Sequence, residues 1–184
     1  MIYLMLADGF EEIEALVPLD ILRRGGCEVQ TVGVGGREIT GAHEITVRAD
    51  ILPEDISLSK TEMLILPGGG RGVDNLKASQ AVRDAVGYAV GNKLPVGAIC
   101  AGPALLAGMG LLRGINAVCF PACAPELEAG GAMLSELPVC EDGIFITAKG
   151  AGVSIPFGLA LLARAKGKET AIKTGKNMQC EITI

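Results

Sequence analysis

The sequence has little positive charge and no long apolar segment. Its 16 lysine and arginine residues face 21 aspartate and glutamate residues, for a net charge of −5, and no basic run exceeds Arg23-Arg24. This balance argues against a general binder of nucleic-acid phosphates. No segment reaches the roughly 18 apolar residues of a membrane span, and the run from Met1 to Leu6 is too short for a signal peptide and lacks a basic flank. We therefore expect a cytoplasmic protein without a nucleic-acid or membrane partner.

Motifs for cofactors and metals are incomplete. The glycines from Gly33 to Gly36 lack the G-x-G-x-x-G spacing of dinucleotide sites, and those from Gly68 to Gly72 lack the Lys-Ser/Thr of a P-loop. Cys119 and Cys123 have the spacing of half a zinc site, but no second close Cys/His pair exists. The sequence therefore predicts no cofactor and no metal. Most of the six cysteines are expected to be reduced thiols.

Glycine, in contrast, is abundant. The chain contains 26 glycines among 184 residues, twice the ~7% usual in proteins. They lack the strict G-x-y repeat of collagen, and a hydrophobic content of 49% excludes a disordered chain. The length is typical of one domain. We predict a single globular domain over residues 1–184.

Apolar runs and helical patterns alternate along the chain. Continuous apolar runs predict buried strands at residues 2–7, 29–34, 63–66 and 95–99. Helical spacing and end signals predict helices at residues 11–24, 79–90, 101–107 and 152–166. This βαβα order predicts an α/β fold with a doubly wound, mostly parallel sheet sandwiched by helices.

Three further features modify this pattern. Residues 37–61 alternate weakly and predict a small β excursion, and Glu141-Asp142-Gly143 predicts a hairpin between strands at 137–140 and 144–147. Residues 170–173 are predicted to form an edge strand. Pro18 is expected to kink or split the first helix.

Cys100 directly follows a predicted buried strand. In Ala98-Ile99-Cys100-Ala101-Gly102, a nucleophile stands among small residues between a strand and a helix, which is the pattern of a nucleophile elbow. The elbow would direct the sulfur toward a helix N-terminus, where the dipole and free N–H groups favour the thiolate. Cys100 is therefore a candidate reactive cysteine. The alternative is a small buried side chain, which is common for a free cysteine.

Two other segments are expected to meet Cys100. The carboxyl ends of parallel strands face one crevice, so the loop after the first strand and the loop from Gly68 to Gly72 should both reach it. The glycine loop exposes N–H groups that suit an oxyanion or a bound anion; the alternative is a tight turn. The first loop leads to Glu11, Glu12 and Glu14. If one of these carboxyl groups lies beside the thiolate, the two groups would share one proton. The alternative, a solvated acidic turn at the start of a helix, is sufficient to explain two of the three glutamates.

Four motifs together resemble the DJ-1/ThiJ/PfpI superfamily, and its DJ-1 branch in particular. They are Gly9-Phe10-Glu11-Glu12-Ile13-Glu14, Leu66-Pro67-Gly68-Gly69, Ala98-Ile99-Cys100-Ala101-Gly102-Pro103 and Lys149-Gly150-Ala151-Gly152-Val153-Ser154. Their order and spacing match over essentially the whole chain. The resemblance implies a flavodoxin-like fold and a homodimer. It also implies a reactive cysteine at Cys100, a protonated carboxyl at Glu14, and oxyanion-binding N–H groups at Gly69 and Ala101.

The surroundings of this site match the family only in part. The resemblance indicates pocket positions at Gly68, Gly70, Phe120, Pro121 and Gly150. Family members with a hydrolytic or glyoxalase-type relay usually carry a His-Pro pair after the elbow helix. This chain has Phe120-Pro121 there, so that relay lacks its histidine.

The family also uses histidine or other basic groups at two further places. The only histidine, His43, lies in the β excursion, where the family's dimer partner contributes basic residues near the pocket; the alternative is an exposed loop histidine. In the protease branch a histidine follows the cysteine, and here that residue is Ala101. A Cys-His protease or amidotransferase would therefore lack its base.

The resemblance implies two main functions. In the first, Cys100 adds to a small reactive dicarbonyl such as methylglyoxal, Glu14 moves the proton, and water releases a hydroxy acid such as lactate without a cofactor, as in the glyoxalase and deglycase activities of the branch. In the second, Cys100 is oxidised and Glu14 donates a hydrogen bond to the sulfinate, in an oxidative-stress sensor or redox-regulated chaperone. A PfpI-type peptidase or amidase is a third alternative. The expected partners are a carbonyl substrate or an oxidant, and a second copy of the chain.

Overall fold

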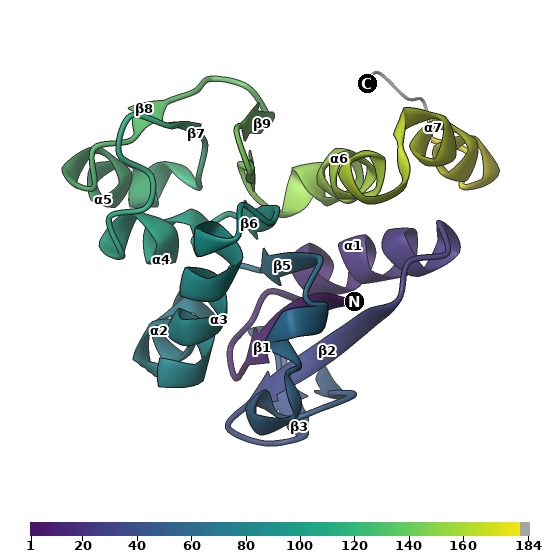
Figure 1. Cartoon of the computed structure of the whole chain (residues 1–184), viewed down its shortest axis with the longest axis horizontal. Helices are drawn as coiled ribbons and strands as arrows, with labels where there is room; N and C mark the ends of the chain where they lie inside the picture. The colour runs from purple at the N-terminus through teal and green to yellow at the C-terminus, as the bar shows by residue number, and fades with distance from the viewer. Residues whose placement is uncertain (181–184) are drawn as a thin grey trace.

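A six-stranded sheet forms the centre of the molecule (Figure 1). The computed structural model describes residues 1–180. The strands of this sheet are β1 (Ile2–Ala7), β2 (Val29–Val34), β5 (Met63–Leu66), β6 (Val96–Ile99), β9 (Val139–Asp142) and β10 (Phe145–Ala148). Their order is β2-β1-β5-β6-β10-β9, and every neighbour is parallel except β9, which runs antiparallel to β10. The predicted α/β fold and the predicted hairpin are therefore confirmed.

Helices cover both faces of the sheet. They are α1 (Glu12–Arg24), α2 (Gly70–Ala78), α3 (Gln80–Gly91), α4 (Gly102–Gly108), α5 (Ala124–Ala129), α6 (Ser154–Lys166) and α7 (Lys168–Asn177). Helices α1, α6 and α7 lie on one side of the sheet and α2 to α5 on the other (Figure 1). Among the described residues, no helix is long and apolar enough to cross a membrane.

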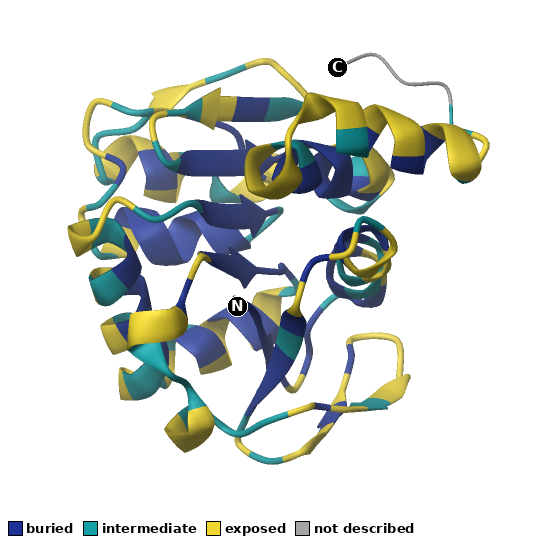
Figure 2. Ribbon diagram, turned by 45° about the vertical axis from the view of Figure 1, so that its right-hand side comes forward, coloured by how far each residue is buried: buried dark blue, intermediate teal, exposed yellow. Residues whose placement is uncertain are grey.

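Strand β1 supplies side chains to two hydrophobic cores. All six of its residues are buried. Its odd-numbered residues pack under α2 to α5, and its even-numbered residues pack under α1 and α6. This alternation is what a strand covered on both faces requires, because successive side chains point to opposite faces. Figure 2 shows the buried strands between helices whose outer surfaces are exposed.

Two small sheets stand outside the main sheet. Strand β3 (Glu38–Thr40) pairs antiparallel with β4 (Thr46–Arg48), and β7 (Asn116–Ala117) pairs parallel with β8 (Met133–Leu134). The β excursion predicted over 37–61 is confirmed for its first half only. Its second half forms two 3-10 turns, at Pro53–Asp55 and Leu58–Lys60.

The prediction that Pro18 splits the first helix is wrong, whereas a kink at Pro18 stays a prediction. Helix α1 runs from Glu12 to Arg24 with Pro18 inside it. Pro18 is buried where α1 packs against α6, and a Cβ on Gly158 of α6 would lie 3.1 Å from the Pro18 Cα. Packing along the whole helix therefore outweighs the cost of about 3 kcal/mol that proline carries inside a helix.

Three helices, α2, α5 and α7, were not predicted from the pattern. The edge strand predicted at residues 170–173 is wrong, since these residues belong to α7, whose buried residues Ala171, Thr174 and Gly175 have helical spacing. Helix α2 begins at Gly70, inside the glycine cluster that was predicted to be a loop. Its buried residues Val73 and Leu76 lie one turn apart and join the core, so burial overrides the low helix propensity of glycine.

Candidate active site

Three loops meet at the carboxyl ends of β1, β5 and β6. The loop after β1 leads to Glu14 in α1, the loop after β5 contains Gly68 and Gly69, and Cys100 directly follows β6. The Gly68 N–H donates a 2.9 Å hydrogen bond to Glu14 Oε2. A Cβ on Gly68 would collide with that carboxylate and with the Cys100 Cβ. The structure thus brings together a thiol, a carboxyl group and a glycine loop that lie far apart in the sequence.

The Cys100 backbone has the left-handed conformation of a nucleophile elbow, with φ +63°. Such a conformation costs a non-glycine residue about 1–3 kcal/mol and persists only where the surroundings hold it. Two hydrogen bonds do so here: the Cys100 N–H donates to the Ala148 carbonyl at 2.9 Å, and the Phe120 N–H donates to the Cys100 carbonyl at 2.9 Å. The elbow is therefore anchored to the neighbouring strand and to the Phe120 loop.

The loop after β5 turns at Gly69. Its φ of +89° lies in the region that favours glycine, and a Cβ there would collide with the Gly9 carbonyl. This conformation directs the Gly69 N–H toward the Cys100 sulfur, where it acts together with the Ala101 N–H. Two N–H groups around one sulfur are an arrangement that can also bind an oxyanion.

The Cys100 thiol is partly buried between these N–H groups and the Glu14 carboxyl. Burial and the negative charge of Glu14 raise the pKa of Cys100 to about 12, while the Ala101 and Gly69 N–H groups act to lower it. The expectation that the elbow favours the thiolate is therefore wrong in net direction, because burial and the carboxylate outweigh the N–H groups. The effect of the Glu14 charge exists only while Glu14 is ionised, so protonation of Glu14 favours the thiolate.

Glu14 is 1% exposed. Burial raises the pKa of Glu14 to about 7, against the opposing effects of its hydrogen bonds with the Cys100 side chain and the Gly68 and Ala151 N–H groups. Two acidic groups in contact release their protons in separate steps, because the second negative charge is opposed by the first. Between these two values, from about pH 7 to about pH 12, the Cys100–Glu14 pair therefore holds one proton between its two members.

The other two glutamates of this motif have structural contacts. Glu11 is the N-cap of α1, and its Oε2 accepts a 2.7 Å hydrogen bond from the Glu14 N–H. Glu12 is only 5% exposed and accepts two 2.7 Å bonds from His43, one from the backbone N–H and one from ring Nδ1. The expectation that two of the three glutamates are solvated is wrong for Glu12, because the loop between β3 and β4 folds over it.

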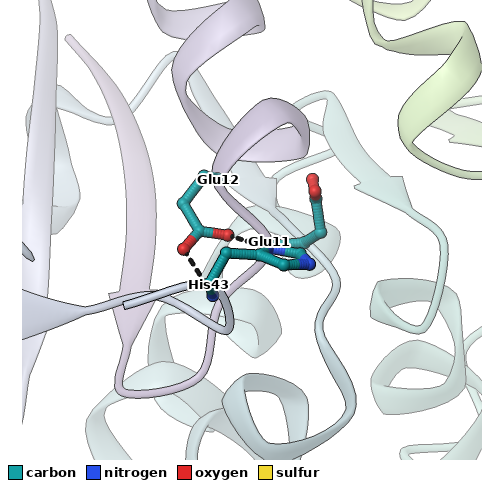
Figure 3. A group of neighbouring side chains, drawn as sticks. All are labelled: Glu11, Glu12 and His43. Atoms are coloured by element: carbon teal, nitrogen blue, oxygen red, sulfur yellow. Dashed lines mark hydrogen bonds and ion pairs between the residues drawn. The ribbon is translucent and has the colours of Figure 1, made fainter. Parts of the chain in front are cut away.

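His43 binds Glu12 within its own chain, as Figure 3 shows. Its side chain is 68% exposed, which agrees with an exposed loop histidine, and its contribution to a partner's site stays a prediction. Among the described residues, Glu11, Glu12 and His43 form the group that could hold a metal ion, since one ligand atom of each lies within 4.8 Å of the others. A cation there would have to displace the bond between Glu12 and the His43 ring.

The remaining pocket residues lie around Glu14 and Cys100 in different ways. Phe120 and Pro121 are exposed, and Gly70 is the exposed first residue of α2. A Cβ on Gly150 would lie 3.7 Å from Phe120 Cδ2 and 3.9 Å from Glu14 Oε1. Gly150 thus lies next to both the Phe120 ring and the Glu14 carboxyl, while Gly70 borders a separate cleft with Arg71 and the loop between β3 and β4.

Two contributors were not identified from the sequence. The Ala151 N–H supports the Glu14 carboxylate, and the Ala148 carbonyl holds the Cys100 backbone. Both act through the backbone, so their side chains carry no chemical signal. The glycine-rich motif after β10 was the available indication, because it marked this loop without showing which N–H group faces the site.

Comparison with known proteins gives consistent matches over most of the chain. A model of the DJ-1/PfpI family matches residues 1–164. The Parkinson disease protein 7 homolog of Danio rerio is 34% identical over 170 residues, 91% of this chain and 90% of that protein. A deglycase of Pyrococcus abyssi is 27% identical over 148 residues, 80% of this chain and 89% of that protein. The solved structure of oxidized Toxoplasma gondii DJ-1 has a TM-score of 0.92 at 29% identity and covers 98% of both chains.

Two glycines beside Glu14 offer a matched test of this geometry. Gly68→Ala should displace the Glu14 carboxyl or the Cys100 side chain and lower the free energy of unfolding by about 1–3 kcal/mol. Gly150→Ala should keep wild-type stability, because its Cβ would meet its neighbours at ordinary distances and its φ of 162° is open to any residue. Urea unfolding measures both. Equal stability of the two variants would contradict the described packing.

The pair of Glu12 and His43 predicts a pH window of stability. The hydrogen bond to Glu12 raises the pKa of His43, so its contribution is complete below the usual histidine value of 6.5 and is lost as the pH rises through the raised value. Burial acts to raise the pKa of Glu12, but the bonds from His43 lower it overall, so its contribution is lost as the pH falls below the usual value of 4.5. His43→Ala, which keeps the backbone N–H, should therefore destabilise the protein more at pH 5.5 than at pH 9. Urea midpoints that differ equally at both pH values would contradict this.

Proposed function

Because this chain belongs to the DJ-1/PfpI family, we propose that it is a cofactor-independent enzyme of the glyoxalase or deglycase type that acts on small reactive dicarbonyls such as methylglyoxal. The observation that carries the proposal is the contact between Cys100 and the buried Glu14, which share one proton beside the Gly69 and Ala101 N–H groups. The similarity to a protein named a deglycase supports the substrate class.

The first step forms a hemithioacetal. The Cys100 sulfur bonds to the aldehyde carbon, the thiol proton passes to Glu14, and the carbonyl electron pair moves onto the oxygen. The Gly69 and Ala101 N–H groups stabilise this oxyanion. Glu14 then returns the proton to the oxygen. A carboxyl group with a pKa of about 7 is suited to both transfers, since it accepts and releases a proton readily at neutral pH.

The second step is an internal oxidation and reduction. Glu14 removes the proton from the former aldehyde carbon, and the hydroxyl proton of the hemithioacetal moves to the ketone oxygen in the intermediate enediolate. Glu14 then delivers the carbon proton to the former ketone carbon. The former aldehyde carbon is oxidised to a thioester and the ketone is reduced to an alcohol, so no external oxidant takes part. Water then attacks the thioester, the carbon–sulfur bond breaks, and sulfur recovers its proton. Methylglyoxal plus water thus gives lactate and a proton.

A second function, an oxidation sensor, is favoured by the similarity to a DJ-1 structure that is described as oxidized. Two peroxide molecules would convert the Cys100 thiol to a sulfinic acid, with sulfur oxidised and each peroxide reduced to water. A protonated Glu14 can donate a hydrogen bond to a sulfinate oxygen. The sensor function needs no histidine and uses Cys100 and Glu14, as the enzyme function does.

Substitution of the two central residues tests the enzyme. Cys100→Ser should form no lactate from methylglyoxal above the uncatalysed rate, and Glu14→Gln should lower kcat/KM by about 100-fold or more. Cys180→Ser is the matched control, since it removes a partly exposed thiol outside the site and should keep full activity. Lactate formation by Cys100→Ser at the wild-type rate would refute the proposal.

The pH profile tests the role of Glu14 separately. Burial raises the pKa of Glu14 to about 7, so below that pH both members of the pair are protonated and no base is present to take the thiol proton. The wild-type kcat/KM should therefore rise with pH through an apparent pKa of about 7. In Glu14→Gln this rise should be absent. An unchanged profile in that variant would assign the titration to another group.

Peroxide titration tests the sensor. Intact mass should show a gain of two oxygen atoms at a small molar excess of peroxide, and peptide mapping should assign it to Cys100. Glu14→Ala should accumulate less of this product, because the sulfinate loses its hydrogen-bond donor. A Cys100 peptide that stays unmodified while other thiols oxidise would contradict the sensor.

A further inference from the structure

Phe120 differs from the other phenylalanines of the chain. Phe10, Phe145 and Phe157 are 1%, 5% and 0% exposed, whereas Phe120 is 49% exposed. Only 3% of residues are aromatic, so an aromatic ring is left half-exposed in a chain that otherwise buries its phenylalanines. An exposed ring beside a reactive group is a common feature of ligand pockets, which combine aromatic side chains with a few polar groups.

The backbone of Phe120 is fixed relative to the nucleophile. Its N–H donates a 2.9 Å hydrogen bond to the Cys100 carbonyl, and its own carbonyl accepts a 2.8 Å bond from the Cys123 N–H. Pro121 follows it and further restricts its backbone to an extended conformation. The backbone from which the ring projects is therefore fixed relative to Cys100.

The Phe120 ring and the Glu14 carboxyl both lie next to Gly150. A Cβ on Gly150 would be 3.7 Å from Phe120 Cδ2 and 3.9 Å from Glu14 Oε1. The φ of Gly150 is 162°, which is extended backbone that any residue adopts. The missing side chain at position 150 is therefore not required by the backbone, and a Cβ there would have no non-neighbouring atom closer than 3.7 Å.

We propose that Phe120 makes this site selective for 2-oxoaldehydes with an aromatic or bulky apolar substituent, such as phenylglyoxal, over methylglyoxal. The proposal rests on the proposed function, since it assigns a substrate class to the same Cys100 site. With the aldehyde carbon at the Cys100 sulfur and Glu14 beside the adjacent carbon, the substituent extends past Glu14 toward Gly150 and the Phe120 ring. A phenyl substituent offers the Phe120 ring an aromatic surface to pack against, whereas a methyl group offers a much smaller contact.

The test compares two substrates in three proteins. Wild type, Phe120→Ala and Phe120→Leu are assayed for mandelate from phenylglyoxal and for lactate from methylglyoxal, and Cys100→Ser gives the uncatalysed background. The ratio of kcat/KM for phenylglyoxal to that for methylglyoxal should fall by about 2-fold to 12-fold in Phe120→Ala, as expected for the loss of one aromatic pair. It should fall less in Phe120→Leu, which keeps apolar contact. Ile172→Ala, which removes another exposed apolar side chain, should keep the wild-type ratio.

Two results would overturn the selectivity. One is a ratio that is unchanged in Phe120→Ala. The other is a rise in kcat/KM for both substrates by the same factor, which would make Phe120 a cover over the site without selectivity.

A reaction without turnover separates this proposal from the proposed function. If wild type converts neither substrate, the proposed function has failed, and selectivity is then read from the alkylation of Cys100 by iodoacetamide and by 2-iodo-N-phenylacetamide, with the adduct located by peptide mapping. A faster reaction with the phenyl reagent that is lost in Phe120→Ala would support Phe120 as the selective residue. If the ratio of the two alkylation rates is the same in wild type and in Phe120→Ala, the selective role of Phe120 is refuted.

Discussion

The site depends on one constraint, the close contact of a buried carboxyl group with a partly buried thiol. Glu14 is 1% exposed and lies against the Cys100 side chain, so the pair cannot carry two negative charges at neutral pH. Three neighbouring features hold the two groups in contact. Glu11 caps α1 and fixes the Glu14 backbone, the Gly68 N–H holds the carboxylate, and the strained elbow of Cys100 presents the sulfur. A larger residue at position 68 would separate the pair.

The sequence was sufficient to predict the strands of the main sheet and the position of Cys100 directly after one of them. Strands buried on both faces are continuous apolar runs, and an elbow needs small residues around its nucleophile, so both leave local signals. Helix α7 was mistaken for a strand because its short sequence contains both β-branched residues and helical spacing. Only its contact with the core decides between them, through Ala171. The same holds for α2, whose glycine-rich start predicts a loop until Val73 and Leu76 are seen in the core.

The raised pKa of the Cys100 thiol could not be derived from the pattern. The elbow correctly indicated N–H groups near the sulfur, and these do act to lower the pKa of Cys100, but burial and Glu14 act more strongly in the opposite direction. How deeply each group is buried is a property of the folded chain. Glu12 illustrates the same limit, since it stands in an acidic run that looks solvated and is instead covered by the loop that carries His43.

The phenylalanine at position 120 changes what the remaining residues must do. A relay that contains a histidine divides proton transfer between two groups. Here the Glu14 carboxyl faces the Cys100 thiol with no histidine at position 120. The proposed chemistry tolerates this, because each proton that Glu14 accepts is returned to an adjacent atom of the same intermediate, and the internal redox step consumes no outside proton. Phe120 also places an apolar surface at the position where the relay would have a polar ring.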